Sequence, residues 1–272
     1  MDNMKFKRCP WRLLSTLEHH FRISNICSRN ANAIVNYHSV SDEQIALFGN
    51  ISPMRFQRDI EFFDTYFEIV DLPEVIEDSH TGTKKIAITF DDGYQNFFTN
   101  AWPILNEWNA PATLFINPSF IGGENKAEII NAHSLSTVYS DMMLNHEQIA
   151  TLAETDLISI GNHTSTHANL TTLSDPEAIE TEICGGKDEI ETEFGIPVNR
   201  FSYPYGSHSD AAIETVRQSH KYGVGTNSGI LSGAVDRHRL PRIGGHNPER
   251  IVRWEVTELS QKIRGYYKRT LF

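Results

Sequence analysis

Two adjacent carboxylates, Asp91 and Asp92, follow a short apolar run and precede a glycine, Gly93. The run, residues 85–90, is rich in the β-branched and apolar residues that favour a buried strand. Gly93 then frees the backbone to turn. The strand therefore delivers both carboxylates to its carboxyl end. Two carboxylates in such a place are costly unless a cation or a catalytic task accounts for them.

Two histidines four residues apart, His163 and His167, follow a second predicted strand at 156–161. On a helical turn, this spacing puts both imidazoles on one face, about 5–6 Å apart at Cβ. With a carboxylate from Asp91 or Asp92 they make a set of three metal ligands that leaves positions open for water. The spacing alone is a weak signal because it also occurs on ordinary surface helices. Its place at a strand end, together with the Asp-Asp-Gly strand end, favours a metal site.

Predicted strands alternate with predicted helices along the chain, and each polar cluster follows a strand. This pattern indicates parallel strands with right-handed crossovers, hence an α/β barrel or an open sheet. We favour the barrel because no glycine-rich phosphate loop follows the first strand, and the carboxyl ends of barrel strands form the catalytic rim. The strands are expected at 33–38, 67–72, 85–90, 112–116, 156–161, 200–203, 222–226 and 239–243.

Helices are expected between these strands, the first opened by Ser52 as cap and Pro53 in the first turn. Pro103 is expected to set a bend or a new start in one helix, and Gly185-Gly186 to weaken the middle of another. Residues 118–145 are expected to form an insertion near the mouth of the site. The helices that follow the first are expected at 73–77, 95–109, 128–143, 145–155, 177–194, 210–219 and 248–264.

Composition limits the class of protein. The 272 residues are 22% charged and 39% hydrophobic, as in ordinary globular proteins with a full core. The net charge of −11 argues against nucleic acid as the main partner. The three cysteines form no Cys-x-x-Cys pair, so neither a disulfide framework nor a cysteine zinc site is expected. The sequence has no run of 18 or more apolar residues, so no membrane-spanning helix is expected.

The N-terminal residues 1–12 are basic, and charged residues interrupt the stretch in which a secretory signal would have its apolar core. We therefore expect a cytoplasmic protein, which can lie at the inner face of the membrane. A helical extension over residues 1–30 is expected before a single domain over 31–272. A basic helix there could touch anionic lipid at the membrane periphery, although a plain solvated helix is the favoured interpretation.

Three segments together resemble the first three motifs of the polysaccharide deacetylases, the NodB-homology or carbohydrate esterase family four. They are Thr-Phe-Asp-Asp-Gly at 89–93, His-Thr-Ser-Thr-His at 163–167 and Arg-Phe-Ser-Tyr-Pro-Tyr-Gly at 200–206. Their order and spacing fit, and the likeness extends over roughly 33–254. The resemblance implies a distorted (β/α) barrel of seven strands, a divalent metal ion, most often Zn²⁺, and removal of N-acetyl groups from amino sugars.

The same resemblance implies roles for the motif residues. Asp91 would be the general base, and Asp92 would bind the metal ion with His163 and His167. A hydrolase needs one carboxylate to hold the ion and another to take a proton from water.

Arg200 and Tyr205 come from the third motif. Arg200 would pair with the base and orient it, or else be a surface arginine at a strand start. Tyr205 would offer its backbone N–H to the oxyanion, or its ring would only pack in the wall of the site.

The general acid is expected from a histidine. Residues 37–40, Tyr-His-Ser-Val, resemble an element of a rearranged branch that includes poly-N-acetylglucosamine deacetylases, in which the first strand supplies the histidine. His38 is therefore the predicted acid and His246 the runner-up. Arg242, at a late strand end, is expected to hold Asp91 or bind substrate. The remaining histidines are expected at the surface: His19, His20, His133, His146, His208, His220 and His238.

The sequence thus predicts a metal-dependent hydrolase that removes N-acetyl groups from amino sugars of a polysaccharide or a glycan precursor. Its partner would be a carbohydrate. The alternatives are a deacylase of a non-sugar amide or an O-acetyl ester, and an inactive glycan-binding protein that keeps the metal.

Overall fold

The computed structural model describes residues 31–43, 47–77, 84–135, 137, 141–231, 234–260 and 262–263. The expected extension over residues 1–30 lies outside these ranges, so it and the domain boundary beside it stay predictions. Within the described ranges, no helix combines the length and the apolar character needed to cross a bilayer.

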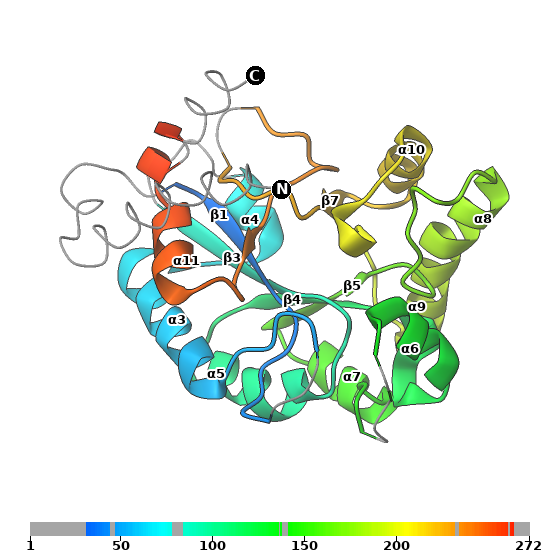
Figure 1. Cartoon of the computed structure of the whole chain (residues 1–272), viewed down its shortest axis with the longest axis horizontal. Coiled ribbons are helices and arrows are strands. Elements are labelled where there is room, and N and C mark those ends of the chain that lie inside the picture. The colour runs from blue at the N-terminus through cyan, green and yellow to red at the C-terminus, as the bar shows by residue number, and fades with distance from the viewer. Residues whose placement is uncertain are drawn as a thin grey trace, which may run out of the picture.

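A single parallel sheet occupies the centre of the molecule, and the helices surround it (Figure 1). Seven strands follow the order β7-β6-β5-β4-β3-β1-β8, and β2 pairs with β3 beside this path. All of these pairings are parallel, so the predicted α/β barrel is confirmed, with seven strands along its main path and β2 as an additional short strand. The strands are β1 (Ala33–Tyr37), β2 (Glu68–Ile69), β3 (Lys85–Phe90), β4 (Ala112–Ile116), β5 (Ile158–Asn162), β6 (Arg200–Ser202), β7 (Tyr222–Val224) and β8 (Ile243–Gly244).

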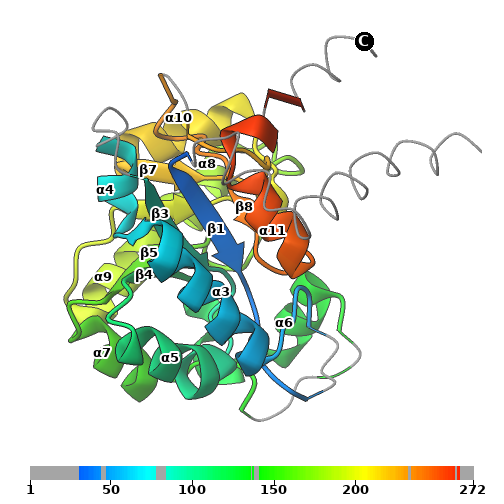
Figure 2. The same cartoon turned by 90° about the vertical axis from the view of Figure 1, so that its left-hand side faces the viewer.

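The segment 240–244 links the two ends of the curled sheet. Leu240 forms an isolated parallel bridge with Val224 of β7, and three residues later Ile243 of β8 pairs with Val35 of β1. Figure 2 shows β8 beside β1 with α11 next to it. The single strand predicted over 239–243 is therefore divided between the two edges. Arg242 lies between these two contacts and is buried.

The helices largely match the predicted ranges. Ser52 caps α3 by accepting from the Arg55 N–H at 3.2 Å, and Pro53 occupies the first turn. Asn145 and Gln148 form a capping box at the start of α7. The helices are α3 (Pro53–Tyr66), α4 (Leu72–Glu77), α5 (Trp102–Glu107), α6 (Lys126–His133), α7 (His146–Ala153), α8 (Pro176–Glu180), α9 (Gly186–Phe194), α10 (Asp210–Ser219) and α11 (Glu249–Glu255).

Two predicted helices are interrupted by π-helical turns where the sequence carries proline or glycine. In η2 (Phe97–Ala101), the Trp102 N–H donates to Phe97 O, five residues earlier, immediately before Pro103. Proline has no N–H to continue the α-helical ladder. The turn η4 (Thr181–Gly185) separates α8 from α9 at the Gly185-Gly186 pair.

One predicted helix is too long, and another is interrupted. The helix expected over 128–143 is α6, which starts at Lys126 and ends at His133, where Ser134 adopts a left-handed φ of 53°. The helix expected over 248–264 is interrupted: α11 ends at Glu255, and residues 258–260 and 262–263 are helical again after a break at 256–257. Periodicity predicted the presence of these helices but not their ends, which depend on local backbone turns.

The core lies between the sheet and its helices. Every residue of β1, β3 and β4 is buried, as expected of parallel strands covered on both faces. Polar residues in these strands, among them Asn36 and Thr89, are buried as well. They are hydrogen-bonded to the groups that follow the strand ends, and so connect the core to the site.

Candidate active site

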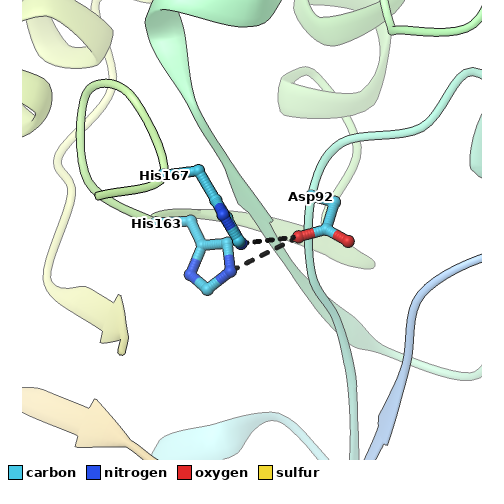
Figure 3. A group of neighbouring side chains, drawn as sticks. All are labelled: Asp92, His163 and His167. Atoms are coloured by element: carbon cyan, nitrogen blue, oxygen red, sulfur yellow. Dashed lines mark ion pairs between the residues drawn. The ribbon is translucent and has the colours of Figure 1, made fainter. Parts of the chain in front are cut away.

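Three predicted metal ligands converge after β3 and β5. Asp92 Oδ1 lies 3.5 Å from His163 Nε2 and 3.3 Å from His167 Nε2. Their ligand atoms all lie within 4.8 Å of one another, and all three residues are buried. Figure 3 shows one carboxylate oxygen turned toward both rings.

The two histidines lie on a loop, not on the helical turn that their spacing predicted. Residues 163–167 form a bend after β5, in which Thr164 has a φ of 66° and His167 a φ of 57°. Asp92 also has a left-handed φ of 77°. Such conformations are uncommon outside glycine and are kept where the surroundings impose them. Backbone turns therefore bring the rings together.

Glu182, in the π-helical turn η4, holds this loop. Its main-chain oxygen accepts from the Ser165 N–H at 3.0 Å. Its carboxylate accepts from the Thr166 N–H at 2.9 Å and from the Thr166 hydroxyl at 2.6 Å. A Cβ on the neighbouring Gly186 would come within 2.8 Å of the Ser165 nitrogen, so the helix approaches this closely only because residue 186 is glycine. π-helical turns often occur at functional sites.

The donor set fits a divalent ion such as Zn²⁺. Ligand bonds of about 2.0–2.2 Å at the tetrahedral angle put donor atoms about 3.3–3.5 Å apart, which is the separation of Asp92 Oδ1 from both nitrogens. His163 Nδ1 donates to Ser202 O at 2.8 Å, which leaves a lone pair on Nε2. Metal-binding histidines are commonly fixed through their other nitrogen in this way. The donor atoms of Asp92, His163 and His167 are thus placed as ligands of such an ion would be.

Asp91, beside this cluster, is paired with Arg242 inside the barrel. Arg242 Nη1 donates to Oδ1 at 2.8 Å, and Nη2 donates to Oδ2 at 2.7 Å. Asn36 Nδ2 donates to the same Oδ2 at 3.0 Å. Arg242 Nη2 also donates to the Ser202 hydroxyl at 3.0 Å. Such bidentate, charge-assisted bonds are among the strongest in proteins, so both oxygens of Asp91 have fixed directions.

These contacts set the ionisation of Asp91. Burial by itself would raise its pKa, but the charges of Arg242 and His163 and the hydrogen bonds from Arg242 outweigh burial and hold the pKa at about 2. Asp91 is therefore ionised throughout the neutral range and can only accept protons. A carboxylate with so low a pKa is a weak base.

The predicted pairing of Arg200 with Asp91 is wrong. Arg200 is the first residue of β6, and its guanidinium pairs with Asp71 and donates to Thr113 Oγ1 at 3.4 Å. The carboxyl end of the strand, where the site lies, begins two residues later at Ser202. Arg242, which the sequence indicated as a second candidate, is the arginine that holds Asp91.

A cavity of about 620 Å³ opens over Asp92, His163 and His167. His38, the predicted general acid, and His246, the runner-up, both line it. His38 follows β1, and its Nε2 lies 3.9 Å from Asp91 Oδ2. His246 is farther along the cavity wall, and the centroids of the His246 and His38 rings are 6.1 Å apart. Burial lowers the pKa of His38, against the charges of the two aspartates, which raise it. Phe48 lies at the rim with its ring 4.9 Å from that of His38.

Tyr205 forms part of the opposite wall. Its backbone has a left-handed φ of 58°, its ring lies 4.8 Å from that of His167, and its hydroxyl donates to Ala132 O at 2.7 Å. The side chain is 52% exposed. The ring thus packs in the wall, as one of the two predicted interpretations had it. The role of its N–H toward an oxyanion stays a prediction.

Sequence reasoning placed two buried histidines at the surface. His133 lines the cavity, with Nδ1 3.8 Å from Asp92 Oδ2, and its side chain is 6% exposed. His220 is buried beside Ser219. Asn36, which donates to Asp91, was missed. Its signal was a polar residue within the apolar strand that precedes His38.

Comparison with known families gives a consistent result. A family model described as polysaccharide deacetylase matches residues 78–224. The poly-beta-1,6-N-acetyl-D-glucosamine N-deacetylase of Staphylococcus epidermidis is 24% identical over 240 residues, covering 79% of this chain and 79% of that protein. YxkH of Bacillus subtilis is 26% identical over 168 residues, covering 61% of this chain and 53% of that protein. The chain thus matches only about half the length of YxkH.

Solved structures show the same fold. The crystal structure of a polysaccharide deacetylase from Bacillus cereus aligns with a TM-score of 0.68 at 20% identity. The alignment covers 84% of this chain and 69% of that one.

Proposed function

This chain belongs to the polysaccharide deacetylase family, and from that premise we propose that it is a metal-dependent hydrolase that removes N-acetyl groups from amino sugars. One observation carries the proposal: an ionised carboxylate, a three-residue metal-ligand set and a histidine all face one cavity. Amide hydrolysis needs an activated water, a stabilised oxyanion and a protonated leaving amine. Each of these needs has a candidate group in the cavity.

Asp92, His163 and His167 would hold the ion. A divalent ion bound there would polarise the acetyl carbonyl and lower the pKa of water to roughly 7. Asp92 Oδ1 faces both nitrogens, and Ser202 O fixes the tautomer of His163, so Asp92 and His163 are oriented before binding.

Asp91 would take a proton from the attacking water. With a pKa of about 2 it is ionised at neutral pH but weakly basic, so it depends on a water made acidic by its surroundings. Arg242 and Asn36 orient its oxygens through their hydrogen bonds. Asp91 would thus act as the base and Asp92 as the metal ligand because the two carboxylates have different partners.

His38 would give a proton to the departing amine. Its Nε2 lies 3.9 Å from Asp91 Oδ2, so the group that receives the proton and the group that delivers one are neighbours. His246 lines the same cavity but lies beyond His38, which makes it the less favoured acid. The Tyr205 N–H would donate to the oxyanion, as an oxyanion-hole donor does.

The rim of the cavity suits a carbohydrate. Phe48 and Tyr205 line it and are 63% and 52% exposed, among the few large apolar side chains so exposed in the described ranges. An exposed aromatic face can pack against the C–H face of a sugar ring while polar groups bind hydroxyls. The Staphylococcus epidermidis relative is named for poly-beta-1,6-N-acetyl-D-glucosamine, and we propose a polymer of N-acetylglucosamine or its precursor as substrate.

The test measures acetate release from β-1,6-linked N-acetylglucosamine oligomers, from acetylxylan and from small N-acetyl amides. The proposal predicts release from the amino-sugar oligomers, abolished by a chelator and restored by Zn²⁺. Release only from acetylxylan would make the protein an O-acetyl esterase. Release only from the small amides would make it a general deacylase, and binding of oligomers without release would make it a glycan-binding protein.

A further inference from the structure

Asn117, the first residue after β4, is hydrogen-bonded to the metal loop, which is the segment 163–167 that carries His163 and His167. The residue is buried. Its Nδ2 donates to Thr164 O at 3.0 Å and also to His163 O. Its Oδ1 is buried and has no hydrogen-bond partner in the described part of the chain. An oxygen in the place of Nδ2 could donate to neither carbonyl, so these contacts also fix which way the amide is turned.

The turn that Asn117 contacts is strained. Thr164 has a left-handed φ of 66°, which is uncommon for any residue except glycine and especially for a β-branched one. Such a conformation persists only where the surroundings impose it. The carbonyls of His163 and Thr164 are successive, and both reach one nitrogen. An amide nitrogen carries two N–H groups, one for each carbonyl, so the side chain of Asn117 matches this turn.

Further contacts join the segment after β4 to the metal loop. The Ser119 N–H donates to Ser165 O at 3.2 Å, and the two serine hydroxyls lie 3.1 Å apart. Glu182 binds the same loop from the π-helical turn η4. The loop is thus fixed between η4 and the segment after β4. Asn117 contacts main-chain oxygens of the loop, so any effect on an ion would pass through the backbone to the two rings.

We propose that Asn117 is a positioning residue of the metal site: by holding the carbonyls of His163 and Thr164, it keeps the strained turn that brings His163 and His167 to one ion. The two imidazoles lie on either side of Thr164 in the sequence, so relaxation of its φ separates them. Groups that orient metal ligands set metal affinity in this way. This role rests on the metal site that the proposed function requires.

The test compares two substitutions at position 117. Asn117→Asp keeps the shape of the side chain but turns an acceptor oxygen toward the two carbonyl oxygens. Asn117→Ala removes both donors and introduces no charge. We expect both variants to bind Zn²⁺ about 10- to 100-fold more weakly than the wild type, measured by competition with a chelating dye. The visible spectrum of the Co²⁺ form should shift in both variants as well.

Asn125→Asp is the matched control. Asn125 belongs to the same connection after β4, and its Nδ2 donates to Ser119 O at 2.7 Å, but the residue is exposed and its side chain does not contact the metal loop. This variant should keep the wild-type Zn²⁺ affinity and Co²⁺ spectrum. Thermal melting of the metal-free proteins checks that each variant is folded.

Wild-type affinity in Asn117→Ala would overturn the proposal, even if Asn117→Asp were weakened, because the loss would then come from the new charge. A metal-free Asn117→Ala protein that does not fold would also overturn it, since Asn117 would then serve the fold as a whole. No substrate is used, so the result is independent of acetate release. A protein that depends on Asn117 for Zn²⁺ but releases no acetate would refute the proposed function and leave the role of Asn117 standing.

Discussion

Arg242 and Asp91 form a bidentate ion pair inside the barrel, with nitrogen–oxygen distances of 2.8 and 2.7 Å and both side chains almost fully buried. Arg242 belongs to the segment that links the last strands of the sheet to the first. The direction of the Asp91 oxygens therefore depends on how the barrel is joined, far along the chain from the strand that carries Asp91.

Replacing Arg242 should damage both stability and activity. Arg242→Gln leaves a buried carboxylate without its charge partner, which costs about 3–5 kcal/mol in the free energy of unfolding. A misdirected Asp91 should lower kcat/KM for acetate release about 100-fold. Arg200→Gln, which breaks the separate pair with Asp71, should leave kcat/KM close to the wild type. Chemical denaturation and initial rates measure the two effects.

A double variant separates charge from folding. Asp91→Asn with Arg242→Met removes both buried charges and should recover much of the stability lost in Arg242→Gln, without recovering activity. Equal losses of kcat/KM in Arg200→Gln and Arg242→Gln would contradict the assignment of Arg242.

Phe48 at the cavity rim should contribute to binding of the sugar chain. Phe48→Ala should raise KM for oligomers roughly 3- to 10-fold, as expected for the loss of one aromatic contact of about 0.5–1.5 kcal/mol. Phe48→Tyr should retain the wild-type KM. Met54→Ala is the control, because Met54 is similarly exposed, at 68%, but does not line the cavity. The same KM in Phe48→Ala and in the wild type would show that this ring does not contact the substrate.

Alanine substitutions at the neighbouring Gly185 and Gly186 should change the free energy of unfolding in opposite directions. A Cβ on Gly186 would come within 2.8 Å of the Ser165 nitrogen, whereas the nearest atom to a Cβ on Gly185 is Thr181 Cγ2 at 3.9 Å. Gly186→Ala should destabilise the fold by about 1–3 kcal/mol and weaken Zn²⁺ binding, because it displaces the loop of His163 and His167. Gly185→Ala should stabilise it by about 0.5–1 kcal/mol. Urea unfolding measures the free energy of unfolding of both variants. Similar changes in the two variants would refute the close contact between Gly186 and Ser165.

His220 should make the fold less stable in mild acid. Burial, assisted by the charges of Lys187 and His238, lowers its pKa to about 3. In the unfolded chain its pKa is about 6.5, so between these values the unfolded state binds more protons, and stability falls as pH falls. Between pH 6.5 and pH 5, His220 should lower the free energy of unfolding by about 2 kcal/mol. His220→Gln should lack this component, so a free energy of unfolding that falls equally between pH 7 and pH 5 in both proteins would contradict it.

Much of the site could be predicted because it lies at strand ends. Asp92, His163 and His167 follow two buried strands, and parallel strands bring their carboxyl ends to one edge. The error with Arg200 has the same geometric origin. Arg200 begins β6, so it lies toward the amino end of the strand, away from that edge. A motif match alone did not distinguish the two ends of so short a strand.

The remaining features depend on contacts between distant segments. The convergence of His163 and His167 depends on left-handed turns and on Glu182, not on helical spacing. His133 lies in a helix whose sequence has no clear amphipathic pattern, so nothing local indicated that its ring is buried. Residues brought together only by tertiary packing leave no periodic signal in the sequence.

The most direct test titrates Zn²⁺ into chelator-treated protein and follows acetate release from β-1,6-linked N-acetylglucosamine oligomers. The account predicts no release without metal and a rate that rises to a plateau at one ion per chain. Asp92→Ala should lose the ion and the activity, and Asp91→Asn should bind the ion and stay inactive. Acetate release by the metal-free protein, or a wild-type rate in Asp91→Asn, would contradict it.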